Sequence, residues 1–183
     1  MQMNEVIFRT CQAEDAQAIE SLFTAVFTES DSETEGLLVG RLARELIEGT
    51  NESDLSGYVG EREGALVASL FFTRLTFSSD VSASLLAPVA VHTAHQGKGI
   101  GQGLILHGID ELRKEGVKFV ITYGDPSFYG KVGFQKISPE VVVPPFALTQ
   151  PEGWLGRPLQ DEAMESLIGE CCCVSAFNNP AYW

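Results

Sequence analysis

The chain has 183 residues, of which 44% are hydrophobic and 20% are charged, so it contains enough apolar side chains to bury a core. This composition excludes collagen-like, solenoid and disordered chains, and no apolar stretch approaches the ~20 residues that a membrane-spanning helix needs. The net charge of −13, from 12 Lys and Arg against 25 Asp and Glu, disfavours binding to nucleic acid.

Location and redox state follow from the N-terminus and the cysteines. The first residues lack a basic segment followed by an apolar run, so no export signal is expected. The four cysteines are Cys11 and the run Cys171–Cys173, whose spacing does not match a metal site. We interpret the run as small apolar residues on a strand buried on both faces rather than as a redox or metal site. The expectation is a cytoplasmic protein without a metal and without membrane binding.

The first half of the chain predicts a strand, two helices and three further strands. Apolar residues at helical spacing follow Asp15, which is expected to cap the first helix. The second helix is expected from about Glu35 to Glu48, with Gly49 ending it. The acidic segment 29–35 between the helices is expected to be a solvated loop. Strands are expected at 6–9, 57–61, 65–77 and 84–91, with a hairpin turn at 62–64.

The second half predicts two more helices among short strands. A helix is expected from near Gly99 to near Gly116 and a short one over 126–131. Strands are expected at 119–123, 134–137 and 169–176. This order indicates a mixed α/β fold in a single domain over 1–183, with a C-terminal extension at 144–183. Pro88 interrupts its strand, and since proline cannot donate to a ladder, the sheet is expected to bulge or open there.

Residues 89–101, with the sequence VAVHTAHQGKGIG, are predicted to form a strand and then a glycine-rich turn that begins a helix. The first turn of a helix has unpaired N–H groups and the positive end of the dipole, and glycines let the backbone approach an anion. A Walker loop needs Ser or Thr after Gly-Lys, and a dinucleotide fingerprint needs a glycine at 102 or 104; neither is present. The turn, with Lys98 inside it, is therefore predicted to hold a pyrophosphate.

Two motifs together resemble the GNAT superfamily of acyl-CoA-dependent N-acyltransferases. Gln96, Gly99 and Gly101 match its signature of Arg or Gln, two residues, Gly, one residue, then Gly or Ala. The second motif, a tyrosine shortly before an aromatic strand start, is present in 128–134. Residues 84–137 are most similar to the YhbS-like branch of predicted acetyltransferases. The resemblance implies a mixed, mostly antiparallel sheet of about six to seven strands, splayed between the fourth and fifth, with helices on both faces.

The resemblance also implies acetyl-CoA as cosubstrate and gives roles to particular residues. The pantetheine arm would bond along the opened strand and the pyrophosphate would rest on the turn. The implied cofactor-binding residues are Val89, Ala90, Val91, Gln96, Gly97, Lys98, Gly99, Ile100, Gly101 and Tyr129. Arg113, Lys114 and Lys131 either contact the adenosine end or, as we favour, are solvent-facing cations.

The implied reaction is direct attack of a neutral amine on the acetyl thioester. Tyr129 is the implied catalytic acid for the CoA sulfur, because a thiol has a pKa of ~8.5 and a phenol one of ~10. A backbone N–H of Val91 or Ala90 would hold the oxyanion. No glutamate lies on the predicted fourth strand, so the general base stays open. Its candidates are Asp125, which more simply caps the short helix, His92, Tyr123 and Glu33.

In the superfamily, segments that match 28–36 and the loops after Pro144 shape the acceptor site. The carboxylates of 29–35 would favour a cationic amine, such as a polyamine, an aminoglycoside-like drug or a peptide amine, although a solvated charge run is the simpler interpretation. Trp154, Tyr182 and Trp183 either wall a pocket or pack against a second subunit of a homodimer. The rival functions are a CoA-binding module without turnover and an acyltransferase with another acyl group or acceptor.

Overall fold

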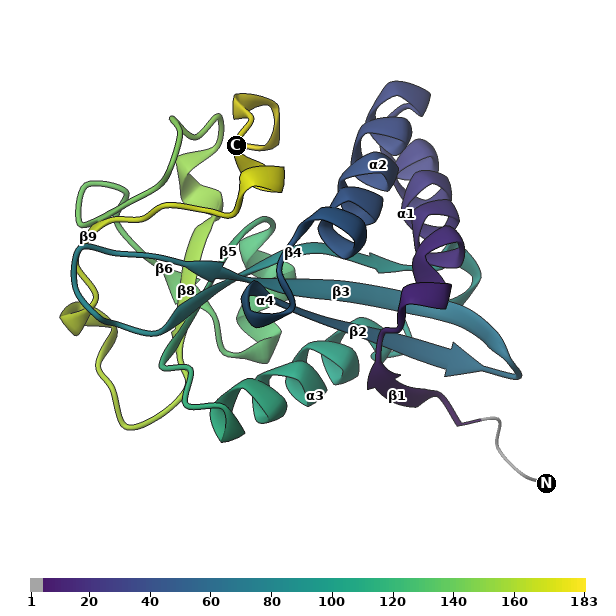
Figure 1. The fold of residues 1–183 in the computed structure, drawn as a ribbon, viewed down its shortest axis with the longest axis horizontal. Coiled ribbons are helices and arrows are strands. Elements are labelled where there is room, and N and C mark those ends of the chain that lie inside the picture. Colours follow the sequence, from purple (N-terminus) through teal and green to yellow (C-terminus); the bar gives the residue numbers. More distant parts are fainter. Residues whose placement is uncertain (1–4) are drawn as a thin grey trace. The chain divides into compact units, whose positions relative to one another are not determined.

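The computed structural model describes residues 5–183 (Figure 1). The helices in this range are α1 (Ala16–Ser30), α2 (Glu33–Gly49), α3 (Ile100–Lys114) and the short α4 (Pro126–Tyr129), together with several 3-10 turns. The strands are β1 (Ile7–Thr10), β2 (Leu55–Arg62), β3 (Ala65–Leu75), β4 (Ala83–Val91), β5 (Phe119–Tyr123), β6 (Gln135–Lys136), β7 (Val142–Val143), β8 (Trp154–Pro158) and β9 (Gly169–Glu170).

The strands form a seven-stranded sheet in the order β1-β2-β3-β4-β5-β8-β6 and a two-stranded sheet of β7 and β9. In the larger sheet β4 and β5 are parallel, whereas β1–β2, β5–β8 and β6–β8 are antiparallel. The parallel pairing runs from Ala83↔Phe119 to Leu86↔Thr122, and β4 continues past it to Val91. Pro88 lies in this continuation. The predicted mixed, mostly antiparallel sheet is confirmed.

The chain divides into two compact units. The first comprises residues up to Phe71 together with Pro88–Gly108, and the second comprises Phe72–Ala87 and Ile109–Trp183. The single domain over 1–183 stays a prediction.

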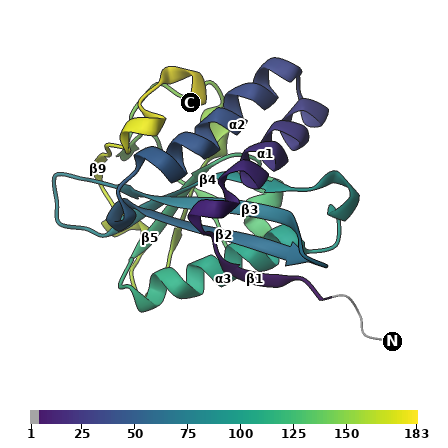
Figure 2. The ribbon, with the colours of Figure 1, turned by 45° about the vertical axis from the view of Figure 1, so that its right-hand side comes forward.

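In the first unit, α1 and α2 lie side by side over one face of β2 and β3, and the beginning of α3 lies on the other face (Figures 1 and 2). The two helices approach closely because Gly36 and Gly40 of α2 face α1. A Cβ atom at either glycine would overlap the hydroxyl oxygen of Thr28 or Thr24. Phe23 of α1 stacks on Phe71 of β3, with ring centroids 6.1 Å apart, in the buried core.

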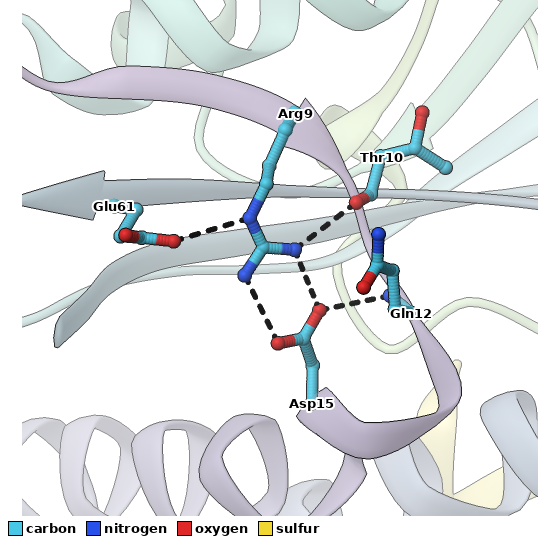
Figure 3. Close-up of polar contacts among 5 residues, drawn as sticks. All are labelled: Arg9, Thr10, Gln12, Asp15 and Glu61. Carbon is cyan, nitrogen blue, oxygen red and sulfur yellow. Dashed lines mark hydrogen bonds and ion pairs between the residues drawn. The ribbon is translucent and has the colours of Figure 1, made fainter. Parts of the chain in front are cut away.

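Arg9 of β1 joins three segments of this unit (Figure 3). Its guanidinium donates to both carboxylate oxygens of Asp15, at 2.8 and 3.0 Å, and to Glu61 of β2 at 3.1 Å. Asp15 also accepts the backbone N–H of Gln12 at 2.8 Å. Asp15 directly precedes α1, as predicted, but its carboxylate bonds Arg9 and Gln12 and makes no bond to the amides of α1. The prediction of a side-chain cap was therefore wrong.

The acidic segment 29–35 is mostly helical, which corrects the predicted loop. Helix α1 continues to Ser30 and α2 begins at Glu33, so only two residues connect them. Ser32 caps α2 by accepting the N–H of Glu35 at 3.1 Å. Glu33 and Glu35 lie in the first turn, where the helix dipole favours negative charge. The dipole gives these two carboxylates a structural role.

The second unit is built around β5 and β8, which pair from Phe119↔Pro158 to Tyr123↔Trp154. Trp154 and Trp183 are buried in it, with ring centroids 6.0 Å apart. Their indole N–H groups donate to the carbonyls of Val142 at 2.8 Å and Phe177 at 3.0 Å. Because both rings are buried, the prediction that they pack against a second subunit was wrong for them, and neither lines the cavity described below. The ring of Tyr182, half-buried, contacts Phe177.

Two predictions for the C-terminal region also need correction. Strand β9 covers only Gly169–Glu170, and in the cysteine run Cys171 is buried, Cys173 half-buried and Cys172 exposed. The chain leaves the extended conformation at the 3-10 turn Ser175–Phe177, so no long strand buries both faces. Strand β8 was not predicted, because Gly156 and Pro158 interrupt its apolar pattern.

Candidate functional site

The first part of the site is the turn between β4 and α3. Gly97 and Gly99 have φ values of 72° and 78°, in the left-handed region that residues with side chains rarely adopt. A Cβ at either glycine would meet no atom within 4 Å, so the backbone conformation, not crowding, requires glycine there. The first helical bond after the turn joins the Gly103 N–H to the Gly99 carbonyl. The amides of 100–102 precede this bond, as an anion-binding helix start requires.

Two side chains of the turn donate hydrogen bonds to the segment just before it, one to the last residue of β4 and one to the 3-10 turn that follows. The Gln96 amide donates to the Val91 carbonyl at 3.0 Å, and the Lys98 ammonium donates to the Ala94 carbonyl at 3.0 Å. Gln96, Gly97, Lys98 and Gly99 are exposed, whereas the side chain of Ile100 is buried in the core. Ile100 can therefore contribute only its backbone to a ligand.

Two histidines flank the turn. His92 accepts the Ala94 N–H through Nδ1 at 3.2 Å, so the lone pair of that nitrogen is occupied, which argues against His92 as a base through Nδ1. Burial of His95 and the positive charges of Lys98 and Arg62 lower the pKa of His95. The negative charge of Glu63 opposes this effect.

The end of β4 carries the predicted strand-end residues. Val89 and Val91 are half-buried and Ala90 is buried, which follows the alternation of a strand. The next backbone N–H, that of His92, donates to the Val67 carbonyl of β3 at 2.8 Å. These residues lie directly before the turn in the chain, as predicted.

The second unit contains Tyr129, at the end of α4. Asp125 caps this helix by accepting the Ser127 N–H at 2.8 Å, and Pro126 occupies the first turn, so the structural interpretation of Asp125 is confirmed. The Tyr129 ring makes edge contacts with Phe128 and Phe134, with centroids 5.0 and 5.7 Å away. Its third neighbour is Gly124, where a Cβ would lie 2.6 Å from Cε2 of the tyrosine. These contacts fix the ring.

Burial raises the pKa of Tyr129 to about 12, and the polar side chain of Thr122 in β5 opposes this rise. The Thr122 side chain is fully buried and its Oγ1 donates to the Leu86 carbonyl at 2.8 Å. The phenol is therefore neutral at physiological pH and can donate a hydrogen bond. Sequence reasoning predicted Gly124 as part of the Gly-Asp-Pro turn but missed its contact with the tyrosine ring, and it missed Thr122, two residues before that turn.

Of the remaining candidate side chains, those of Tyr123, Arg113 and Lys114 have structural partners. The Tyr123 hydroxyl accepts the Gln150 N–H at 2.7 Å and bonds the Thr149 hydroxyl at 2.9 Å, so it holds a loop. Arg113 bonds Asp110 at 2.7 Å and Lys114 bonds Glu111 at 2.6 Å, both on the α3 surface. Lys131 is exposed.

The second unit also contains a cavity of about 860 Å³ between two irregular segments of the C-terminal region. Apolar residues, prolines and the three cysteines dominate its lining. The lining residues are Pro139, Val143, Pro144, Pro145, Phe146, Ala147, Leu148, Pro151, Glu170, Cys171, Cys172, Cys173, Ser175 and Asn178. Glu170 is the one carboxylate among these described residues, and none of them is Lys or Arg. The cavity therefore suits an apolar or cationic ligand rather than an anion.

Residues 5–183 contain no group of three or more His, Cys, Asp or Glu side chains arranged to hold a metal ion. In the same range, no helix has the length and apolar character needed to cross a bilayer.

The chain is similar to known acetyltransferases in sequence and fold. A family model described as "Acetyltransferase (GNAT) domain" matches residues 8–137. The N-acetyltransferase YjhQ of Escherichia coli K12 is 27% identical over 180 residues, which is 95% of each chain. The N-acetyltransferase YhbS of the same strain is 31% identical over 122 residues, which covers 66% of this chain and 68% of YhbS.

Solved structures agree with this fold. The crystal structure of Escherichia coli YhbS in complex with CoA superposes with a TM-score of 0.84 at 22% identity, covering 98% of this chain and 95% of that one. A GNAT acetyltransferase from Brucella melitensis in complex with acetyl-CoA gives 0.70 at 22% identity, covering 96% and 99%. With a family match over more than half its length, and with both motifs inside the matched residues, the chain belongs to the GNAT family of N-acetyltransferases.

Proposed function

We propose that this protein transfers the acetyl group of acetyl-CoA to a primary amine of a small molecule or peptide. The observation that carries the proposal is the turn 97–101, with two glycines at positive φ before the first-turn amides of α3. The relatives crystallised with CoA and with acetyl-CoA support the choice of ligand. In the proposal the amides and Lys98 bind the pyrophosphate, and the backbone of Val89–Val91 binds the pantetheine arm.

The amine must lose its proton before it attacks. A lysine-like amine has a pKa of ~10.4, so the neutral form costs about 4 to 5 kcal/mol at pH 7. In the proposed step the amine nitrogen bonds the carbonyl carbon while the backbone N–H of Val91 or Ala90 donates to the oxyanion. The C–S bond then breaks, the sulfur keeps the electron pair, and the extra proton of the new amide nitrogen leaves to water.

Tyr129 donates to the departing sulfur in this proposal. With the phenol pKa at about 12 and a thiol pKa of ~8.5, complete transfer of the proton to the sulfur is uphill by about 5 kcal/mol. Tyr129 therefore acts first as a hydrogen-bond donor that stabilises the thiolate. It becomes a stronger acid only if its phenolate gains a hydrogen bond.

The acceptor is proposed to be a cationic amine that binds in the cavity of about 860 Å³. Support comes from the net charge of −13, from Glu170 in the lining and from the lack of cations among the described lining residues. The apolar walls favour an amine that carries an apolar body.

The proposal includes the whole chain, 1–183, as one catalytic domain. A cytoplasmic location and a homodimer stay predictions. Sedimentation or light scattering gives the oligomeric state directly.

Release of free thiol from acetyl-CoA, measured with a panel of amines, tests the function. The panel includes spermidine, kanamycin, a lysine peptide and phenethylamine, each with its N-acetylated form as a control. We expect thiol release that depends on the amine. Calorimetric binding of acetyl-CoA without thiol release from any amine would instead favour a CoA-binding module, and preference for a longer acyl-CoA would favour another acyltransferase.

A further inference from the structure

The tyrosine helix, which is α4 with the 3-10 turn Gly130–Val132 that continues it, ends in a Schellman motif. Gly133 has a φ of 86°, in the left-handed region, and its N–H donates to the Gly130 carbonyl at 3.2 Å. The N–H of Phe134 donates to the Tyr129 carbonyl, also at 3.2 Å. These two bonds, with an apolar contact between the outermost residues, define the motif. The rings of Tyr129 and Phe134 supply that contact, with centroids 5.7 Å apart.

A side chain from the sheet completes this helix end. The motif itself provides no donor for the carbonyl of Val132, which is one of the last carbonyls of the helix. Arg157 of β8 donates to that carbonyl, with its Nη1 2.6 Å from the oxygen. The guanidinium also lies against Gly133, where a Cβ would be 3.2 Å from Nε and 3.3 Å from Cζ. Its positive charge suits the negative end of the helix dipole.

The Val132 carbonyl is the polar contact that determines where the guanidinium lies. Arg113, which is also in the second unit, bonds the carboxylate of Asp110 at 2.7 Å. For Arg157, by contrast, the structure over residues 5–183 shows the Val132 carbonyl and no carboxylate as partner. A half-buried charge is costly unless it is hydrogen-bonded, so the arginine and the helix end hold each other in place.

The sheet order makes Arg157 a suitable anchor. The tyrosine helix connects β5 to β6, and β8 lies between those two strands and pairs with both. The connection must therefore span β8. Arg157 lies on β8 opposite Val120 of β5, and its bond to Val132 attaches the connection to the strand that it crosses.

We infer that Arg157 is a positioning residue for Tyr129, because it attaches the end of the tyrosine helix to β8 and so fixes where the phenol points. This inference rests on the proposed function, in which Tyr129 donates to the departing sulfur. A small displacement of such a donor slows the chemical step and leaves binding of the cosubstrate almost intact. All the contacts in the argument lie within the second unit.

Arg157→Met tests the inference, because methionine keeps most of the apolar stem and removes the guanidinium. With the most active amine of the panel, we expect kcat to fall about tenfold, with KM for acetyl-CoA changed less than about twofold. Arg157→Lys keeps a donor and should restore kcat to within about threefold of the wild type. If Arg157→Met does not fold, Arg157→Gln, which is too short to reach Val132, takes its place in each measurement.

Arg113→Met is the matched control. Arg113 also donates to a backbone carbonyl of the second unit, that of Leu159 at 2.7 Å, but it makes no bond to the tyrosine helix. We therefore expect kcat of Arg113→Met to equal that of the wild type. A loss of kcat as large as that of Arg157→Met would contradict the inference, because removal of any arginine from this unit would then have the same effect.

A spectroscopic readout without substrate separates this inference from the proposed function. The fluorine resonance of a fluorotyrosine incorporated at position 129 depends on the neighbouring rings of Phe128 and Phe134. In Arg157→Met the resonance should move toward that of the free amino acid, because the ring loses its fixed contacts. In Arg157→Lys and Arg113→Met it should stay in place. An unchanged resonance in folded Arg157→Met would overturn the inference, even if the protein is an active acetyltransferase.

A double-mutant cycle completes the test. If Arg157 acts through Tyr129, Arg157→Met should have little effect on kcat in a Tyr129→Phe background. An equal effect in both backgrounds would show that Arg157 supports the fold alone, and the inference would then be wrong. If the fluorine resonance moves as expected but neither the wild type nor any variant releases thiol, Arg157 does position Tyr129 and the proposed function fails.

Discussion

The side-chain amide of Gln96 donates a hydrogen bond to the carbonyl oxygen of Val91, across the turn that joins β4 to α3. The bond connects the first residue of the glycine-rich signature to the last residue of the strand. Gln96 therefore holds the geometry of the turn, whether or not its side chain contacts the cofactor.

Replacing Gln96 with Ala should raise KM for acetyl-CoA about three- to tenfold, because the loss of one hydrogen bond costs about 0.5 to 1.5 kcal/mol. The effect on kcat should be smaller. Calorimetry of CoA binding and initial-rate kinetics measure the two quantities. Gln135→Ala, on the exposed surface of β6, is the control and should change neither. Equal KM values for the two variants would show that the Gln96–Val91 bond does not support the site.

Gly99→Ala should weaken both the fold and CoA binding. The φ of 78° is unfavourable for alanine by about 1 to 2 kcal/mol, although the added Cβ has free space around it. Differential scanning calorimetry and CoA titration measure the two effects. Gly49→Ala is the control, since Gly49 also has free space but no positive φ. If Gly49→Ala destabilises the protein as much as Gly99→Ala, backbone strain is not the cause.

The turn and the tyrosine helix were predictable because local chemistry determines them. The positive φ values at 97 and 99 require glycine, and Asp125 followed by Pro126 favours the start of a helix. Both preferences are local and do not depend on distant parts of the structure. Strand β5 was predicted with its observed bounds, because its apolar run lies between clear turn signals.

The bond of Thr122 was not predictable in the same way. Thr122 has the pattern of any strand residue, and its bond to the Leu86 carbonyl exists only after β4 and β5 pair. The cavity was missed for a similar reason, since its walls come from two separate segments, within 139–151 and 170–178, that carry no regular apolar period. Such long-range contacts depend on tertiary structure, which periodicity does not encode.

Gly124→Ala should reduce kcat by about tenfold or more and leave KM for acetyl-CoA nearly unchanged. The new Cβ would lie 2.6 Å from Cε2 of Tyr129, so the ring must move. Gly130→Ala is a matched control on the other side of the tyrosine. It has a helical φ of −58° and free space for a Cβ, and it should keep full activity. Near-equal kcat values for the two variants would contradict a role for the position of the Tyr129 ring.

The activity should not decline as the pH rises through the ordinary phenol pKa of ~10. Burial raises the pKa of Tyr129 to about 12, so the neutral donor form persists over the whole range in which the fold is expected to be stable. Initial rates at saturating substrates from about pH 7 to about pH 10.5 test this. A decline centred near pH 10 that disappears in Tyr129→Phe would show that the phenol titrates normally.

The bidentate bond between Arg9 and Asp15 should make a pH-dependent contribution to stability. The side chain of Asp15 is only 11% exposed, and the Arg9 guanidinium holds the pKa of that carboxyl below its usual value. A group whose pKa is lower in the folded state stabilises the fold above its unfolded pKa of ~3.9 and loses that effect as the pH falls through the folded value.

Arg9→Met should therefore lower the free energy of unfolding by about 2 kcal/mol at pH 7, and the difference from the wild type should shrink below about pH 4. Urea unfolding at several pH values measures it. Arg44→Met is the control, because Arg44 also bonds two carboxylates, Glu20 and Glu48, but on the helix surface, where solvent screens the pairs. Its effect should be smaller and sensitive to salt. If the loss in Arg9→Met is the same at pH 7 and at pH 3, packing of the arginine stem rather than the Asp15 charge stabilises the junction of β1 and α1.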